Sequence, residues 1–352
     1  MEKVCYILGA GFSAPLGLPV MSNFLSHARD LYTTDPEEYS SFKRVFDEIR
    51  EMHICKTYYA ADLLNIEEIL SILEMKSFVD KNTERVEFAD FILKLIDALT
   101  PSPLDPHRSF PGNWNDFVFG NDEAMRFVGS FVAALLRVRI RRMKSRLFEI
   151  DQHNDGPRYS VISLNYDMIL EDIADSTNRA FSSAGHEAGI RFEREGYDPT
   201  WNRTNLAKLH GSVDDDTVVP PTWRKGNADS VIPAWDHARK ILRDCSHIRI
   251  LGYSLPESDN YIRYLLKSSV VDSSNLKTID AICLDWDGSV ERRFRDFFIF
   301  RDFRFKNADI LSCFKGVFEF GRKRHQVEDP ICDEVRFARL ESAHTLFMET
   351  DR

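Results

Sequence analysis

Five short polar clusters in the sequence each follow an apolar, strand-like run, and their residue types suit the binding of a nucleotide. Glycines let a backbone turn tightly beside a phosphate, amides and carboxylates bind ribose hydroxyls, and an imidazole acts as a general base near neutral pH. Ligands of parallel sheets bind outside the carboxyl ends of the strands, so the clusters are predicted to meet at one crevice. They comprise residues 9–13, 165–167, 210–211, 252–254 and 285–287.

The first cluster belongs to the sequence GAGFSA, which fits the G-x-G-x-x-G/A pattern of a dinucleotide-binding turn. It stands between an apolar run at 4–8 and a segment with helical spacing at 21–32. In this setting the backbone can approach a pyrophosphate and the helix N-terminus supplies N–H donors. The alternative is a plain tight turn. Asp30 has about the right separation for a ribose carboxylate, but it falls late in the predicted helix and receives no role.

Asn165, Asp167 and His210 are the candidates for chemistry at the next two strand ends. Asn165 is predicted to face a ligand. Asp167 is predicted to cap the following helix whatever else it does, because a carboxylate satisfies the free N–H groups at a helix start. His210 stands beside Gly211, which leaves space around the imidazole; the alternative is a structural histidine.

The last two clusters offer contacts for the rest of a nucleotide. Gly252 and Ser254 place small residues where a phosphate or a ribose can approach. Asp285 offers a carboxylate for ribose hydroxyls, and Trp286 offers a face for stacking. Ordinary turn chemistry explains both clusters equally well.

The elements that would position these clusters alternate between strands and helices, which predicts an α/β, Rossmann-like, doubly wound and mostly parallel sheet. No convincing strand appears between residues 33 and 150, so we expect a large helical insertion there. The expected domains are an α/β domain at 1–32 plus 151–306, the insertion at 33–150 and a C-terminal extension at 307–352. Strands are expected at 4–8, 159–164, 206–209, 248–251, 278–284 and 298–305, and helices at 61–79, 86–99, 124–150, 167–175, 234–244, 260–269 and 333–348.

Composition excludes several classes of protein. With 43% hydrophobic and 29% charged residues, the chain is neither disordered nor collagen-like. The longest apolar stretch, 127–136, is half the length of a membrane span, and the first residues make a poor signal peptide, so we expect a cytoplasmic protein. The six cysteines form no CxxC pair and no two histidines have ligand spacing, which predicts no metal.

The charge distribution argues against direct nucleic-acid binding, because the formal net charge is −10. One basic run, 137–146, is an exception: it is expected on a helix, either as a contact for nucleic acid or an acidic partner, or as a solvated face.

Together and in this order, the clusters resemble the sirtuin-like superfamily. Its members carry GAG-x-S, N-x-D, H-G and G-x-S segments and then a polar loop; here these read GAGFS, NYD, HG, GYS and DWD. Sirtuin deacylases also carry a four-cysteine zinc module after the H-G pair and an arginine after the opening turn, and this sequence has neither. With its helical insertion and NYD segment, the chain resembles instead the bacterial sirtuin-like NADases of antiphage defence.

The resemblance implies an NAD+ glycohydrolase that uses NAD+ as its substrate, needs no zinc and releases nicotinamide and ADP-ribose. It gives His210 the role of general base and Asn165 that of orienting water and the nicotinamide ribose. The implied cofactor-binding residues are Gly9, Ala10, Gly11, Phe12, Ser13, Asp167, Gly252, Ser254 and Asp285.

Two other classes of function stay open. One is an NAD-dependent protein deacylase or ADP-ribosyltransferase, although the missing zinc module argues against deacylation. The other is a non-enzymatic NAD- or nucleotide-binding subunit, against which the pair Asn165 and His210 argues.

For the NADase, the resemblance implies an abortive-infection effector that depletes NAD+ when activated. Its implied partners are further copies of the chain and an activator such as a HerA-type ATPase or a short Argonaute. The interface is expected in residues 33–150 or 307–352.

Overall fold

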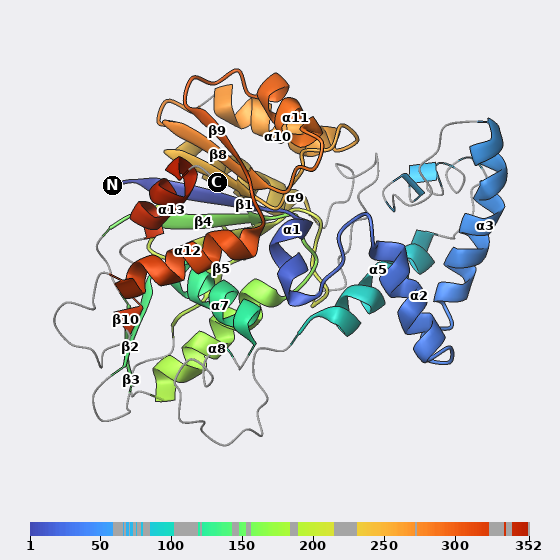
Figure 1. Cartoon of the computed structure of the whole chain (residues 1–352), viewed down its shortest axis with the longest axis horizontal. Helices are drawn as coiled ribbons and strands as arrows, with labels where there is room; N and C mark the ends of the chain where they lie inside the picture. Colours follow the sequence, from blue (N-terminus) through green and yellow to red (C-terminus); the bar gives the residue numbers. More distant parts are fainter. Residues whose placement is uncertain are drawn as a thin grey trace.

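A seven-stranded sheet, in which all neighbouring strands run parallel, forms the centre of the computed structural model (Figure 1). The strand order is β5-β6-β4-β1-β7-β8-β9. The predicted α/β, Rossmann-like, doubly wound fold is therefore confirmed. The structure describes residues 1–58, 85–101, 122–142, 148–152, 156–183, 189–214, 231–271, 273–323, 334–335 and 340–350, with Phe119 and single residues between 66 and 79.

The strands of this sheet follow the apolar runs in the sequence. Their bounds are β1 (Lys3–Leu8), β4 (Arg158–Ser163), β5 (Phe192–Glu193), β6 (Thr204–Lys208), β7 (His247–Leu251), β8 (Thr278–Cys283) and β9 (Phe303–Asn307). The six predicted strands are confirmed. The last begins later than expected, because helix α11 (Ser289–Phe297) is followed by a loop before β9.

Both faces of the sheet are covered by helices, which is why its strands are apolar on both sides. Along β1, Val4, Tyr6 and Leu8 belong to one buried cluster, and Cys5 and Ile7 belong to the other. The first face is covered by α7 (Glu123–Leu135), α8 (Ile169–Ser183), α12 (Ile310–Lys323) and α13 (Leu340–Glu349). The second is covered by α9 (Ile232–Asp244), α10 (Asn260–Val271) and α11.

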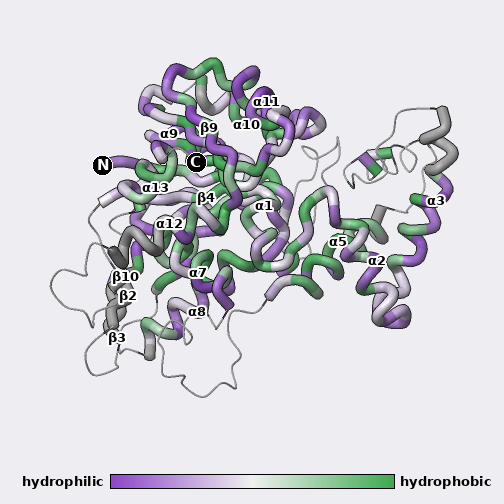
Figure 2. The backbone as a smooth tube through the Cα atoms, in the orientation of Figure 1, coloured by the Kyte–Doolittle hydropathy of each residue, from purple (hydrophilic) through white to green (hydrophobic). Residues whose placement is uncertain are grey.

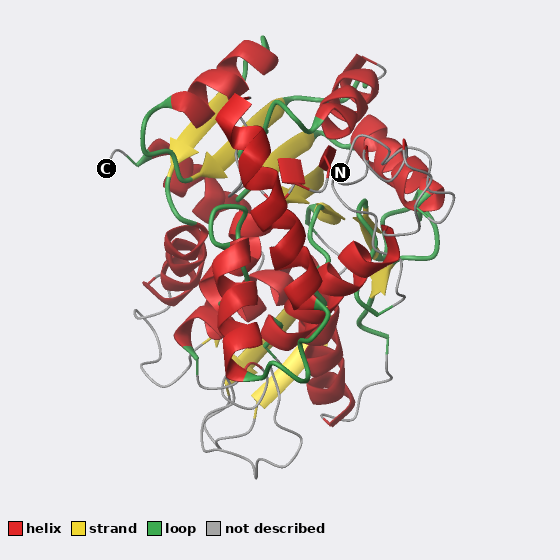
Figure 3. Cartoon of the chain, turned by 90° about the vertical axis from the view of Figure 1, so that its right-hand side faces the viewer, coloured by secondary structure: helices red, strands yellow, loops and turns green. Residues whose placement is uncertain are grey.

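The views agree with this layered arrangement. Figure 3, turned by 90°, shows helices on both sides of the strands. In Figure 2 the buried helix α7 is largely hydrophobic, whereas much of α2 and α3 is hydrophilic. Within the described residues, no helix is both long and apolar enough to cross a membrane.

A helical lobe projects from the sheet at the right of Figure 1. It consists of α2 (Phe24–Thr34), α3 (Phe42–Tyr58) and α5 (Arg85–Leu99), which pack on one another. Phe91 lies at its centre, with its ring centroid 4.6 Å from that of Phe42 and 6.0 Å from that of Phe24. The predicted helix at 86–99 is confirmed, while most of the predicted helix at 61–79 lies outside the described residues.

The prediction of one helical segment at 124–150 is wrong beyond Leu135. The chain turns at Arg137, whose φ is 59°, and enters a small antiparallel sheet in the order β10-β2-β3. The strands are β2 (Val138–Arg142), β3 (Phe148–Gln152) and β10 (Glu334–Val335). The reason is visible in VRIRR, where apolar and basic residues alternate with the period of a strand. The start of the basic run 137–146 thus lies in β2, and the rest lies outside the described residues.

The C-terminal helix α13 is attached to the sheet by charged groups. Tyr6, Arg249, Asp280 and Arg304 are neighbours in register across β1, β7, β8 and β9, and we call them the polar row. Arg249 donates to the Tyr6 hydroxyl at 2.6 Å and to both carboxylate oxygens of Glu341 on α13. Within the polar row, Arg304 donates to both carboxylate oxygens of Asp280 at 2.7 Å. From α13, His344 Nε2 lies 2.7 Å from Asp280 Oδ2.

Replacing Asp280 by asparagine is expected to lower the free energy of unfolding by about 2 kcal/mol near neutral pH. Burial raises the pKa of Asp280, but the hydrogen bonds from His344 and Arg304 outweigh burial and hold it at about 2. In the unfolded chain the pKa is about 4, so this stability is present above pH 4 and is lost as the pH falls towards 2.

Urea denaturation of both proteins between pH 7 and pH 2 checks this expectation. The difference between them should shrink below pH 4. Asp302→Asn, in the exposed loop before β9, is the control and should match the wild type. A difference that stayed constant down to pH 2 would contradict the assignment.

Candidate active site

A cavity of about 680 Å³ lies at the carboxyl ends of the central strands. All five predicted clusters contribute to its wall. The cluster at 210–211 contributes His210, the cluster at 285–287 contributes Trp286, and each of the other three contributes at least three residues. The cluster residues that line it are Gly9, Ala10, Gly11, Ser13, Asn165, Tyr166, Asp167, His210, Gly252, Tyr253, Ser254 and Trp286. The structure therefore brings together residues up to 277 positions apart, from Gly9 to Trp286.

The floor of the cavity is a close contact between the turns that follow β1 and β7. The amide of Gly9 donates to the Leu251 carbonyl at 3.0 Å, and that of Gly11 donates to the Gly252 carbonyl at 2.9 Å. Gly252 has a φ of +63°, and a Cβ there would lie 2.4 Å from the backbone nitrogen of Phe12. Here the glycines serve the packing of backbone on backbone, in addition to any approach of a phosphate.

Asn165, Ser13 and Asp167 form a hydrogen-bonded chain on one side of the cavity. The Asn165 amide donates to the Gly9 carbonyl at 3.0 Å and to the Ser13 hydroxyl at 3.1 Å. The Ser13 hydroxyl in turn donates to Asp167 Oδ2 at 2.7 Å. All three side chains are buried, so this chain fixes the rotamer of the Asn165 amide.

Asp167 caps a helix, as predicted, and its role in binding a ligand stays a prediction. Its Oδ1 accepts the backbone N–H of Ile169 at 3.2 Å, so it caps α8, and the residue also lines the cavity. Burial raises the pKa of the Asp167 carboxyl, while Lys208 and the Ser13 hydroxyl oppose that effect.

The imidazole of His210 is held in one tautomer. Its Nδ1 lies 2.9 Å from the Leu164 carbonyl oxygen, which can only accept a hydrogen bond, so Nδ1 carries the proton. In the neutral ring Nε2 is then the basic nitrogen. The ring is buried and lies beside that of Tyr166, with centroids 5.9 Å apart.

Lys208 is a buried charged residue beside the site that the sequence analysis did not single out. Its buried ammonium donates to the Asp167 carbonyl and the Ser212 hydroxyl at 2.6 Å each, and to the Tyr166 carbonyl at 3.4 Å. It also pairs with Glu171 Oε1 at 3.4 Å. A lysine within the apolar strand run before His210 was the available signal, because a buried charge must be paired.

Two predicted cofactor-binding residues do not line the cavity. The ring of Phe12 packs on Phe131 and Phe314 in the core. The carboxylate of Asp285 accepts the backbone N–H groups of Val290 and Glu291 at 3.3 and 2.9 Å, where α11 begins.

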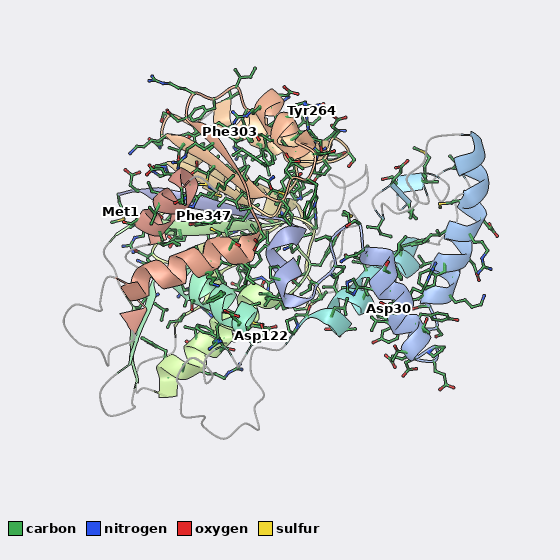
Figure 4. The ribbon with its side chains drawn as sticks, viewed as in Figure 1. Met1, Asp30, Asp122, Tyr264, Phe303 and Phe347 are labelled. Atoms are coloured by element: carbon green, nitrogen blue, oxygen red, sulfur yellow. The ribbon has the colours of Figure 1, made fainter. Side chains whose placement is uncertain are left out.

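Other wall residues come from outside the predicted clusters. Asp259 is buried and accepts a hydrogen bond from the Tyr253 hydroxyl at 2.8 Å. Leu18 from the segment before α2, Phe24 at the start of α2 and Ile96 of α5 also line the cavity. Asp30, by contrast, is exposed on α2 in the lobe (Figure 4).

Comparison with known families identifies one part of the chain that contributes to this site. Residues 159–299 match the sequence model described as a SIR2-like domain. This chain carries a SIR2-like domain. The matched segment runs from β4 to the end of α11 and contains Asn165, Asp167, His210 and Gly252. A SIR2-like domain indicates an NAD-using enzyme of the sirtuin-like family.

Among the solved structures that are similar to this chain is a crystal structure of Sir2 in complex with the inhibitor EX-527, 2′-O-acetyl-ADP-ribose and deacetylated p53 peptide. It shares 13% sequence identity over 91% of this chain and 94% of that chain, with a TM-score of 0.33. No match was found among curated protein sequences. Among the residues that the structure describes, no group of three or more His, Cys, Asp or Glu side chains is arranged to hold a metal ion.

Proposed function

We propose that the protein is an NAD+ glycohydrolase, which cleaves NAD+ into nicotinamide and ADP-ribose. The observation that carries the proposal is the meeting of Asn165, Asp167 and His210 at one side of a cavity in a SIR2-like domain. A basic imidazole nitrogen can accept a proton from the attacking water, and an oriented amide and a carboxylate can bind that water or the ribose hydroxyls.

The cavity suits a dinucleotide in size and in the order of its wall residues. Its volume of about 680 Å³ falls within the usual range of ligand sites. The turns after β1 and β7 lie between the Asn165–His210 side and the Trp286 side, because β1 and β7 are the central strands. We propose that Gly9, Gly11 and Gly252 lie against the diphosphate and that Ser254 binds the adenosine half.

In the proposed reaction the bond between ribose C1′ and the nicotinamide nitrogen breaks, and nicotinamide leaves with the bonding electron pair. The ribose then has oxocarbenium character, and a water oxygen forms the new bond to C1′. His210 Nε2 accepts the proton that the water loses. Asn165 orients that water and the ribose hydroxyls, and its hydrogen bonds to Ser13 and Gly9 keep the amide in place.

We further propose that the enzyme is a cytoplasmic effector of antiphage defence that depletes NAD+ upon activation. This rests on the resemblance of the motifs and on the cost of an uncontrolled NADase to its own cell. Repression until further copies of the chain or an activating partner assemble on it follows from that cost.

The test is nicotinamide release from NAD+ by the purified protein, alone and with candidate partner proteins or nucleic acids. We expect nicotinamide and free ADP-ribose in equal amounts, with release lost in Asn165→Ala and unchanged in the control Asn275→Ala, an exposed position. ADP-ribose found attached to protein would favour the transferase. NAD+ binding with no release under any condition would favour a binding subunit.

A further inference from the structure

Tyr166 lies between Asn165 and Asp167 in the sequence, and the proposed reaction gives its aromatic ring no role. The ring lines the cavity and lies beside that of His210, with ring centroids 5.9 Å apart and ring planes inclined by 35°. The two rings are thus closer to a stacked than to an edge-on arrangement. Their separation is within the distance over which an aromatic ring attracts a cation. Tyr166 is therefore placed to act on the imidazole itself.

The fold holds the Tyr166 ring in this position. The Tyr166 carbonyl accepts the backbone N–H of Val213 at 3.1 Å and the Lys208 ammonium at 3.4 Å, which ties the loop after β4 to the segment that follows His210. The ring also packs against the buried cluster of the first sheet face. Both hydrogen bonds are made by the backbone of Tyr166, so a substitution of its side chain tests the ring while these two bonds remain available.

His210 becomes positively charged when Nε2 accepts a proton, and its surroundings make that charge costly. The imidazole is buried, and burial disfavours the charged form of a histidine. The Lys208 ammonium next to Tyr166 is a second buried cation. The face of an aromatic ring carries a negative partial charge and stabilises a neighbouring cation. The other titratable side chains in the same cavity wall are those of Asp167, Tyr253, Asp259, Cys283 and Asp309.

We propose that Tyr166 is a positioning residue that orients the His210 imidazole and stabilises its protonated form while the water attacks. The proposal rests on the proposed function for the identity of the reaction. The imidazole is neutral before the attack and gains charge during it, so the attraction to the ring is stronger in the transition state than in the ground state. Such an interaction raises kcat and contributes little to the binding of NAD+.

A titration of the His210 side chain in the full chain, followed by nuclear magnetic resonance, tests the proposal without turnover. In protein that is isotope-labelled at histidine Cε1, the His210 signal is identified by its absence in His210→Asn. Tyr166→Leu should lower the pH midpoint of this signal by about 0.4 to 1.5 pH units, because the protonated ring loses its cation–π contact. Tyr166→Phe keeps an aromatic ring and should keep the wild-type midpoint.

Nicotinamide release by the same variants separates kcat from KM. Tyr166→Leu should lower kcat by about 2- to 30-fold and leave the KM for NAD+ nearly unchanged, and Tyr166→Phe should restore kcat. Tyr197→Leu is the matched control, because its ring also lies beside a histidine, His237, with centroids 6.0 Å apart. Tyr197 precedes β6, whose opposite end leads to His210. This control should change neither the His210 midpoint nor kcat.

A His210 midpoint that Tyr166→Leu left unchanged would overturn the proposal. An effect of Tyr166→Phe as large as that of Tyr166→Leu would overturn it as well, since the ring would then not be the cause. An equal change of the midpoint in Tyr197→Leu would assign the effect to lost stability and would also contradict the proposal. The titration needs no hydrolysis, so its failure is distinct from an absence of nicotinamide release.

Discussion

Replacing His210 by alanine is expected to lower the rate of nicotinamide release by about 10²- to 10⁴-fold, the usual contribution of a general base. The Leu164 carbonyl fixes the proton on Nδ1 and leaves Nε2 as the basic nitrogen. Without that nitrogen, the attacking water loses the side chain that is proposed to receive its proton. The affinity for ADP-ribose should change by less than threefold, because His210 is proposed to act in bond cleavage and not in ligand binding.

His210→Asn separates catalysis from structure. The asparagine amide can replace Nδ1–H as a donor to the Leu164 carbonyl, but it has no basic nitrogen. We therefore expect a melting temperature close to that of the wild type and the same loss of release as in His210→Ala. If His210→Asn kept more than a tenth of the wild-type rate, His210 would be a structural histidine.

Lys208→Met is expected to lower the free energy of unfolding by about 3 kcal/mol, since the buried carboxylate of Glu171 loses one of its two cationic partners. The methionine has a similar length but cannot donate to the carbonyls of Tyr166 and Asp167. It also leaves Glu171, whose side chain is 11% exposed, with Arg194 at 3.4 Å as its remaining cation. Denaturation in urea measures this loss.

The same substitution should reduce nicotinamide release, because Lys208 connects the loop that carries Asn165 with the segment that carries His210. Lys277→Met is the matched control: Lys277 also pairs with a glutamate, Glu2, at 2.6 Å, but its side chain is 57% exposed. Such a surface pair contributes only about 0–1 kcal/mol. Equal stability losses in the two variants would contradict the assigned role of Lys208.

The strand ends of this site could be predicted because their signals are local. An apolar run followed by a glycine or a polar residue is visible within a few residues, as in residues 4–13 and 248–254, and parallel pairing then brings such ends together. The direction of each side chain depends instead on tertiary neighbours. That is why Phe12 and Asp285, which stand inside correctly placed clusters, point to the core and to a helix start.

The wrong prediction of a helix beyond Leu135 has a different cause. The helix α7 and the strand β2 follow one another without a proline or a glycine between them, and Arg137 makes the turn with an uncommon backbone conformation. The missed residues Lys208 and Asp259 depend on partners elsewhere in the fold, such as Glu171 and Tyr253. The periodicity of a sequence does not indicate which distant side chains will become hydrogen-bond or ion-pair partners.

The helical lobe shares side chains with the cavity, and this has a thermodynamic consequence. Phe24 lines the cavity and also packs on Phe91 inside the lobe, and Ile96 of α5 lines the same wall. A movement of the lobe that shifts these side chains changes the affinity of the cavity for its ligand. By reciprocity, a bound ligand changes the equilibrium of that movement by the same factor. A molecule that bound the lobe would therefore sense whether the cavity is filled, without touching it.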